Sequence, residues 1–146
     1  MSIKQRWYKF KPLPPDIMEK IQSLRPTFEK KGVLLAYLFG SLAEKGSGED
    51  VDLAILPGER DFTNMREALG EALGTERVDV VNLKMASPLL RYQVIKTGAL
   101  IYKKDEEVET DFEMAVLREY RDTSYMRKKQ AKILEARTKE WLSSQK

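Results

Sequence analysis

Residues 33–56 read VLLAYLFGSLAEKGSGEDVDLAIL, and this stretch decides how the rest of the chain is arranged. An apolar run ends at Gly40-Ser41, and after a short polar loop a second apolar run begins around Asp50 and Asp52. We interpret the two runs as strands and the Gly-Ser pair as a tight turn. Because side chains alternate along a strand, both aspartates are predicted to point the same way.

Two carboxylates held about 7 Å apart on one strand repel each other, which costs stability unless a positive charge lies between them. A divalent metal ion is the obvious candidate for that charge. The nearby Gly40-Ser41 turn is suited to phosphate, because glycine lets the backbone approach closely and serine offers a hydroxyl and an amide. The stretch therefore suggests a site for a metal ion and a phosphate.

The composition narrows the chemistry further. A chain of 146 residues with 42% hydrophobic and 34% charged residues fits one soluble globular domain with a normal core. With no cysteine and no histidine, the sequence excludes disulfides, thiolate or imidazole metal sites and histidine catalysis. Any metal must be bound by oxygen, which favours Mg²⁺, Mn²⁺ or Ca²⁺. Acid–base work falls to carboxylates, lysines or tyrosines.

The sequence gives no sign of a membrane segment or a signal peptide. Its longest apolar run, residues 33–39, falls well short of the roughly 18 residues that a membrane span requires. The N-terminus lacks the apolar region of a signal peptide. The expected compartment is the cytoplasm.

The net charge of +3 combines basic ends with an acidic centre. Residues 1–15 carry a net +4, residues 127–146 a net +5 and residues 16–126 a net −6. Such ends fit nucleic acid or an acidic partner protein, and they fit equally well two solvated, frayed termini. The aromatic residues of the first segment fit packing on the domain better than stacking on bases.

Periodicity and turn residues predict alternating helices and strands. A helix follows Asp16, with a kink or break at Pro26, and another begins at Asp61 and stops at Gly74. The other expected elements are strands at 33–39, 77–83 and 99–102 and helices at 87–98 and about 108–141, the last split near Thr123-Ser124.

This order predicts an α/β (α+β) fold, a small mixed β-sheet with helices packed on it. We divide the chain into a basic N-terminal arm (residues 1–15), a central domain (16–105) and a C-terminal helical extension (106–146).

A third acid, Asp79, stands in the apolar run RVDVVNL. A carboxylate inside an apolar strand is hard to explain structurally, because it buries a charge without a partner. If this strand lies beside the one carrying Asp50 and Asp52, the three carboxylates can converge. Three such oxygens on one sheet edge suit one or two Mg²⁺ ions and a nucleoside triphosphate.

These residues resemble a known family. Gly40-Ser41, an eight-residue spacer and the run from Asp50 to Leu53 are similar to the G-S-x-D-x-D signature of the DNA polymerase beta-like nucleotidyltransferases. With Asp79 and the segment SPLLRYQVIKTGALIY, the chain resembles the minimal members of that superfamily. The segment FEMAVLREYRDTSYMRK further resembles the antitoxin subunits of MntA–HepT toxin–antitoxin pairs.

The resemblance implies a nucleotidyltransferase fold and a role for each residue. Asp50, Asp52 and Asp79 would be the catalytic and metal-binding acids, with Asp52 shared between two Mg²⁺ ions and Asp79 helping to deprotonate the attacking hydroxyl. Gly40 and Ser41 would hold the triphosphate of the substrate, ATP. The implied reaction is adenylylation of a tyrosine on a cognate HepT-like toxin, which silences the toxin. The implied partners are therefore that toxin and a nucleotide, with a hetero-oligomer possible and neither membrane nor nucleic acid expected.

The chain departs from the family pattern in two places. The spacer between Ser41 and Asp50 is shorter than in most close relatives. Relatives often carry arginines after the Gly-Ser, whereas here the residues are Leu42-Ala43-Glu44, followed by Lys45. Both departures bear on how the triphosphate is held.

Two other functions remain open from the sequence: a nucleotidyltransferase acting on a small molecule such as an antibiotic, and an antitoxin subunit that works only by binding. Lys84 and Arg91 fit a solvated helix face better than a phosphate contact. The tyrosines at 92, 120 and 125 fit packing better than the role of an acceptor.

Overall fold

The computed structural model describes residues 12–59 and 62–145. The basic and aromatic residues of the predicted arm, up to Lys11, lie outside the described residues, as does Asp61. The helices are α2 (Ile17–Gln22), α3 (Arg25–Lys30), α4 (Ser41–Lys45), α5 (Met65–Leu73), α6 (Pro88–Thr97) and α7 (Glu106–Ser144). The strands are β1 (Val33–Phe39), β2 (Val51–Pro57), β3 (Val78–Asn82) and β4 (Ala99–Lys103).

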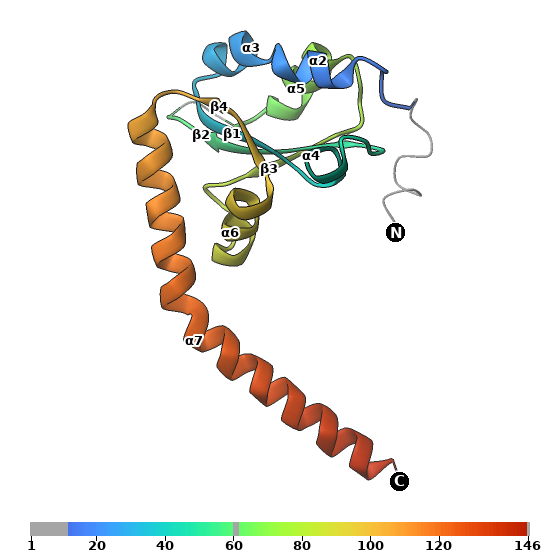
Figure 1. Ribbon diagram of the computed structural model, residues 1–146, viewed down its shortest axis with the longest axis vertical. Helices are drawn as coiled ribbons and strands as arrows, with labels where there is room; N and C mark the ends of the chain where they lie inside the picture. Colours follow the sequence, from blue (N-terminus) through green and yellow to red (C-terminus); the bar gives the residue numbers. More distant parts are fainter. Residues whose placement is uncertain (1–11, 60–61, 146) are drawn as a thin grey trace.

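The four strands form one mixed sheet in the order β3-β2-β1-β4 (Figure 1). β1 pairs antiparallel with both β2 and β4, whereas β2 and β3 run parallel. Helices lie on both faces of the sheet: α2, α3 and α5 on one, α6 and the start of α7 on the other. The predicted fold class, a small mixed sheet covered by helices, is confirmed.

The uninterrupted apolar run of β1 is explained by burial on both faces. Ala36 and Leu38 belong to the core under α2, α3 and α5. Leu35 and Tyr37, which alternate with them, belong to a second core closed by residues of α6 and α7. A strand that is buried on both sides shows no polar alternation, so its sequence is apolar at nearly every position.

The helix predicted after Asp16 is interrupted, as expected, before Pro26. α2 ends at Gln22 and α3 begins at Arg25, so the proline occupies the first turn of α3, where its missing N–H costs nothing. The prediction of a helix starting at Asp61 is wrong: α5 begins at Met65. Asn64 precedes it with a φ of 65°, a left-handed conformation that asparagine tolerates and that sets the start of the helix.

The break predicted near Thr123-Ser124 is also wrong. α7 is one helix of 39 residues that starts on the domain and projects away from it, changing direction partway (Figure 1). The Thr123 hydroxyl donates to the carbonyl of Glu119 at 2.9 Å. This back-bonding to the preceding turn bends a helix without ending it. In the part of the chain that the structure describes, no helix combines the length and apolar content needed to cross a membrane.

Side chains from β1 and α6 anchor the first half of α7. The hydroxyl of Tyr37, which is buried on β1, donates to Glu113 Oε1 of α7 at 2.8 Å. Arg91 on α6 pairs with Glu119 at 3.1 Å and also donates to the carbonyls of Leu83 and Lys84. The start of α7 is thereby fixed to the sheet and to the loop after β3.

Replacement of Tyr37 by Phe should lower the free energy of unfolding at neutral pH by about 1–2 kcal/mol. The variant keeps the ring but loses a buried hydrogen bond to a carboxylate, and the half-buried Glu113 can regain part of its hydration. Urea unfolding at pH 7 checks this value. Tyr125→Phe is the control, because Tyr125 is 69% exposed and its loss should be neutral.

The same variant should reveal a pH dependence. Burial, and then the hydrogen bond to Glu113, raise the pKa of Tyr37. The folded chain therefore keeps this proton where the unfolded chain, with a pKa of about 10, has lost it. The contribution of Tyr37 to stability is thus complete below pH of about 10 and falls as the pH rises further. The stability difference between wild type and Tyr37→Phe should narrow between roughly pH 9 and 11; a constant difference would contradict this.

Candidate functional site

Asp52 and Asp79 lie directly opposite each other on neighbouring parallel strands. Val51 and Leu53, which flank Asp52, belong to the core under α2, α3 and α5, and so does Val78, which precedes Asp79. By the alternation of a strand, both acids project from the opposite face of the sheet, the one covered by α6 and α7. The structure therefore brings together the acid of the VDL run and the acid of the VDVV run.

Gly40 meets Asp52 across the β1–β2 pair. Phe39, the last residue of β1, is the register partner of Asp52, and Gly40 follows it with φ 75° and ψ −157°. This conformation is essentially reserved for glycine. A Cβ atom at Gly40 would overlap the Asp52 carboxylate oxygen Oδ2 and lie 3.1 Å from Cγ. The glycine thus leaves the space that the Asp52 carboxylate occupies.

The loop from Ser41 to Asp50 is compact. Ser41 starts α4 and is exposed, whereas the next residue, Leu42, is buried in the core and anchors this short helix. Gly46 ends α4 in a left-handed turn, and the chain then passes so close to Ser41 that a Cβ atom at Gly48 would lie 2.9 Å from the Ser41 Cβ. Ser41 is therefore placed between Gly40 and the returning loop.

Asp50 precedes β2 and is only 6% exposed. Arg77, at the corresponding point before β3, holds this part of the loop: its Nη1 donates to the carbonyl of Glu49 at 3.1 Å. Its own carbonyl accepts from the amide of Val51 at 2.8 Å. Sequence reasoning missed Arg77, and the only signal for it is a basic residue directly before the apolar run that carries Asp79.

The carboxylate oxygens of the three predicted acids are ligands of the kind that a hard cation such as Mg²⁺ prefers. Each of the three predicted acids takes part in a polar or electrostatic interaction in the structure. Across residues 12–59 and 62–145, however, no three acidic side chains are grouped so that they could hold a metal ion. The oxygens that the strand register brings together are those of Asp52 and Asp79, a pair suited to Mg²⁺ in a chain without histidine or cysteine.

Other residues considered from the sequence have structural roles. Arg91 links α6, the loop after β3 and α7, as described above. The rings of Tyr92 and Tyr120 stack with centroids 3.7 Å apart, and the Arg127 guanidinium lies 4.0 Å above the Tyr120 ring. The preference for packing over an acceptor role at the tyrosines of 92 and 120 agrees with this geometry.

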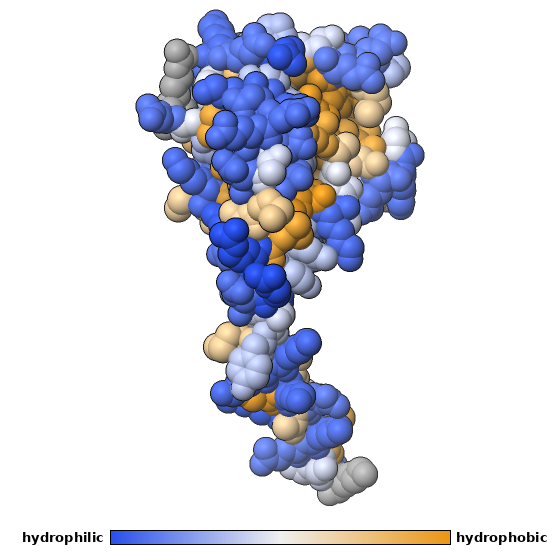
Figure 2. Space-filling view, turned by 60° about the vertical axis from the view of Figure 1, so that its left-hand side comes forward, coloured by the Kyte–Doolittle hydropathy of each residue, from blue (hydrophilic) through white to orange (hydrophobic). Residues whose placement is uncertain are grey.

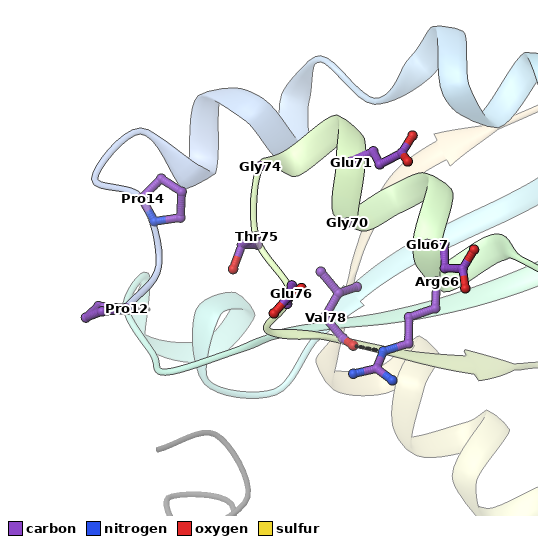
Figure 3. Close-up of a pocket in the computed structure, with 10 residues that line it drawn as sticks. All are labelled: Pro12, Pro14, Arg66, Glu67, Gly70, Glu71, Gly74, Thr75, Glu76 and Val78. Atoms are coloured by element: carbon purple, nitrogen blue, oxygen red, sulfur yellow. Dashed lines mark hydrogen bonds between the residues drawn. The ribbon is translucent and has the colours of Figure 1, made fainter. Parts of the chain in front are cut away.

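An open pocket lies at the start of β3, on the α5 side of the sheet and therefore not on the face from which Asp52 and Asp79 project (Figure 3). It is bordered by α5, by the turn after α5 and by the prolines that precede α2. Arg66 of α5 reaches across it and donates from Nε to the carbonyl of Val78 at 2.8 Å. Because Val78 directly precedes Asp79, this hydrogen bond fixes the β3 backbone next to Asp79.

Comparison with known proteins assigns this part of the chain to a family. The family model "Polymerase beta, Nucleotidyltransferase" matches residues 19–107, which contain β1 to β4 and all three acids. No match is found among curated protein sequences.

Several solved structures are similar over most of the chain. A toxin–antitoxin complex crystallised with AMP-PNP is 27% identical with a TM-score of 0.61, covering 81% of this chain and 96% of that one. A mutant MntA–HepT toxin–antitoxin complex is 27% identical with a TM-score of 0.58, covering 82% and 97%. A tri-AMPylated Shewanella oneidensis HEPN toxin in complex with MNT antitoxin gives 24% identity, a TM-score of 0.62, and coverage of 82% and 97%. At that identity the last shows the fold alone.

Replacement of Gly40 by Ala should disturb the position of Asp52 and destabilise the chain. The forbidden backbone angles and the overlap with the carboxylate should together lower the free energy of unfolding by about 2–4 kcal/mol. Gly46→Ala is the matched control: its φ is 73°, but a Cβ atom there meets nothing within 4 Å. It should cost only about 1 kcal/mol. Equal losses in thermal unfolding would show that the Asp52 contact is unimportant.

Proposed function

Because the chain belongs to the polymerase beta-type nucleotidyltransferases, we propose that it transfers AMP from ATP, with Mg²⁺, to a tyrosine hydroxyl of a cognate HepT-like toxin and thereby neutralises it. The single observation that carries the proposal is the register of β2 and β3, which sets Asp52 opposite Asp79 with Gly40 against the Asp52 carboxylate. The cytoplasm, where ATP is present, is the proposed compartment.

The residues divide the work of the transfer. Asp52 and Asp79, which the strand register sets opposite each other, would hold Mg²⁺, and Asp50 would join them as a third ligand by turning toward the ion. The bound ions would polarise the α-phosphate and neutralise charge on the attacking and leaving oxygens. Gly40 and Ser41 would hold the triphosphate, since Gly40 leaves room for close approach and the Ser41 side chain is exposed.

The proposed transfer of AMP forms one bond at the α-phosphorus and breaks another. The acceptor oxygen attacks the α-phosphorus, the bond between that phosphorus and the bridging oxygen to the β-phosphate breaks, and pyrophosphate leaves. The proton of the acceptor hydroxyl passes to the Asp79 carboxylate, which stands on the edge strand of the sheet, where an acceptor can approach.

The choice of a protein acceptor is supported by the solved neighbours. The two complexes at 27% identity are toxin–antitoxin assemblies, one of them with the ATP analogue AMP-PNP. A small-molecule nucleotidyltransferase needs further structure to enclose its substrate, and in the described residues only α7 lies beyond the sheet domain. Adenylylation of a toxin is therefore the first reaction to test.

With Mg²⁺ and α-labelled ATP, the purified chain should label a co-expressed HepT-like toxin, and Asp52→Asn should reduce labelling by at least about 100-fold. Loss of a carboxylate that holds the ion removes several kcal/mol of transition-state stabilisation. Asp111→Asn is the control, because Asp111 is an exposed residue of α7. Labelling should also stop when EDTA removes the metal.

Three results would contradict parts of the proposal. Full labelling by Asp52→Asn would remove Asp52 from the site. Labelling of aminoglycosides without any protein partner would identify a small-molecule enzyme. A toxin that binds in a stable complex and is neutralised without label would identify a binding-only antitoxin.

A further inference from the structure

The second half of α7 leaves the domain without packing on it. Every residue from 128 to 145 is exposed, and the helix projects freely in Figure 1. We define the distal segment as residues 126–144. At its start, Arg127 ties the segment to the preceding turns: it lies over Tyr120 and donates to the Tyr120 carbonyl at 2.7 Å.

The distal segment carries exposed apolar side chains at helical spacing, which form a stripe among charged residues. In Figure 2 the projecting helix is mostly hydrophilic, with separate apolar side chains between the charged ones. Met126 and Ile133 are seven positions apart, and so are Leu134 and Trp141. Four such residues fall within about a third of the helix circumference, the arrangement of a helix that packs in a groove or against another helix. Their exposed fractions are 56%, 44%, 62% and 61%.

An unsupported helix of this kind is costly in water. Most helical stability in proteins comes from packing of an apolar face, and a projecting stretch of this length is marginal alone. A tryptophan, an isoleucine and a leucine in one exposed row are typical of an interaction site. We therefore expect another molecule to pack against the stripe.

The charge of the distal segment indicates which kind of molecule packs against the stripe. Residues 127–145 hold six basic and two acidic residues, a net +4, so the segment as a whole is basic. A second distal segment packed on the first would set +4 against +4, which disfavours self-association through this face. An apolar groove with acidic rims complements the segment in both respects.

We propose that the distal segment of α7 is a docking helix for an acidic, grooved partner protein, and that this partner is the toxin that receives the nucleotide. The second part rests on the proposed function. The docking surface is separate from the acids of the sheet: α7 is tied to the domain through Glu113 and Glu119, and the segment extends beyond both. Docking through the helix tethers the acceptor near the active site and raises its local concentration.

Trp141 provides a direct readout. The chain has two tryptophans, so in a Trp7→Phe background the emission reports Trp141 alone. Addition of the HepT-like toxin, in a form free of tryptophan, should shift the emission to shorter wavelength as the indole leaves water. The shift should also occur with Asp52→Asn, which separates docking from catalysis.

Ile133→Glu should weaken toxin binding at least about 10-fold, because it places a charge in the apolar contact. Ser143→Glu is the matched control: it introduces the same charge at an exposed position of the helix that is two residues from Trp141 and so turned away from the stripe, and it should bind as the wild type does. For labelling, Ile133→Glu should raise KM for the toxin and leave kcat unchanged, a split that general unfolding would not produce. Circular dichroism checks that both variants keep their helix.

Several outcomes would overturn the docking proposal. The first is equal binding by Ile133→Glu and Ser143→Glu, and the second is an unshifted Trp141 emission in the toxin complex. The third is a shift on concentrating the chain alone, and the fourth is a shift only with vesicles of phosphatidylserine. The third would identify a second copy as the molecule that packs against the stripe, and the fourth a membrane surface. Failure of the proposed function reads differently: the Trp141 shift and its loss in Ile133→Glu would persist, but no toxin would be labelled.

Discussion

The site depends on the close approach of Gly40 to the carboxylate of Asp52. This approach requires that a glycine directly follow Phe39, the last residue of β1. It also requires that β2 pair with β1 so that Asp52 lies opposite Phe39. The pairing is secured far from the acid, by apolar side chains that fill both faces of β1. A one-residue slip of β2 would carry Asp52 to the face under α2, α3 and α5 and place Val51 at the site. The position of one carboxylate is thus determined by two hydrophobic cores.

The same strand also carries the anchor of α7. Tyr37 lies two residues before Phe39 and, through Glu113, fixes the first turns of the long helix. Arg91 and the Tyr92–Tyr120 stack extend that attachment along α6. The direction in which the distal segment leaves the domain is therefore set by contacts with β1, the strand whose last residue pairs with Asp52. A partner bound to the segment would be oriented relative to the sheet by these contacts, most of which are partly buried.

Much of this arrangement is readable in the sequence because it rests on local patterns. The apolar run of β1, the Gly40 turn and the alternation that gives Asp52 and Asp79 one orientation all follow from period and residue type. What the sequence does not reveal depends on partners distant along the chain. Arg77 looks like an ordinary charged residue until β3 is placed beside β2, and Arg91 looks like a solvated one until α6 meets α7. The break predicted near Thr123 failed because polar residues there bond to their own helix.

The eight-residue loop between Ser41 and Asp50 connects β1 to β2 without disturbing the strand pairing. The strand register on both sides is intact: Phe39 still faces Asp52, and Asp52 still faces Asp79. Within the loop, Gly46 turns the chain with a positive φ. Gly48 then passes so close to Ser41 that it has no room for a side chain. Two glycines thus let the chain return from Ser41 to Asp50 within eight residues. Since Leu42 is buried in the core, an arginine at that position could not reach a phosphate without dismantling the anchor of α4. In the proposed site, the charge of the triphosphate would therefore be met by Mg²⁺ and by the loop backbone rather than by a cation at position 42.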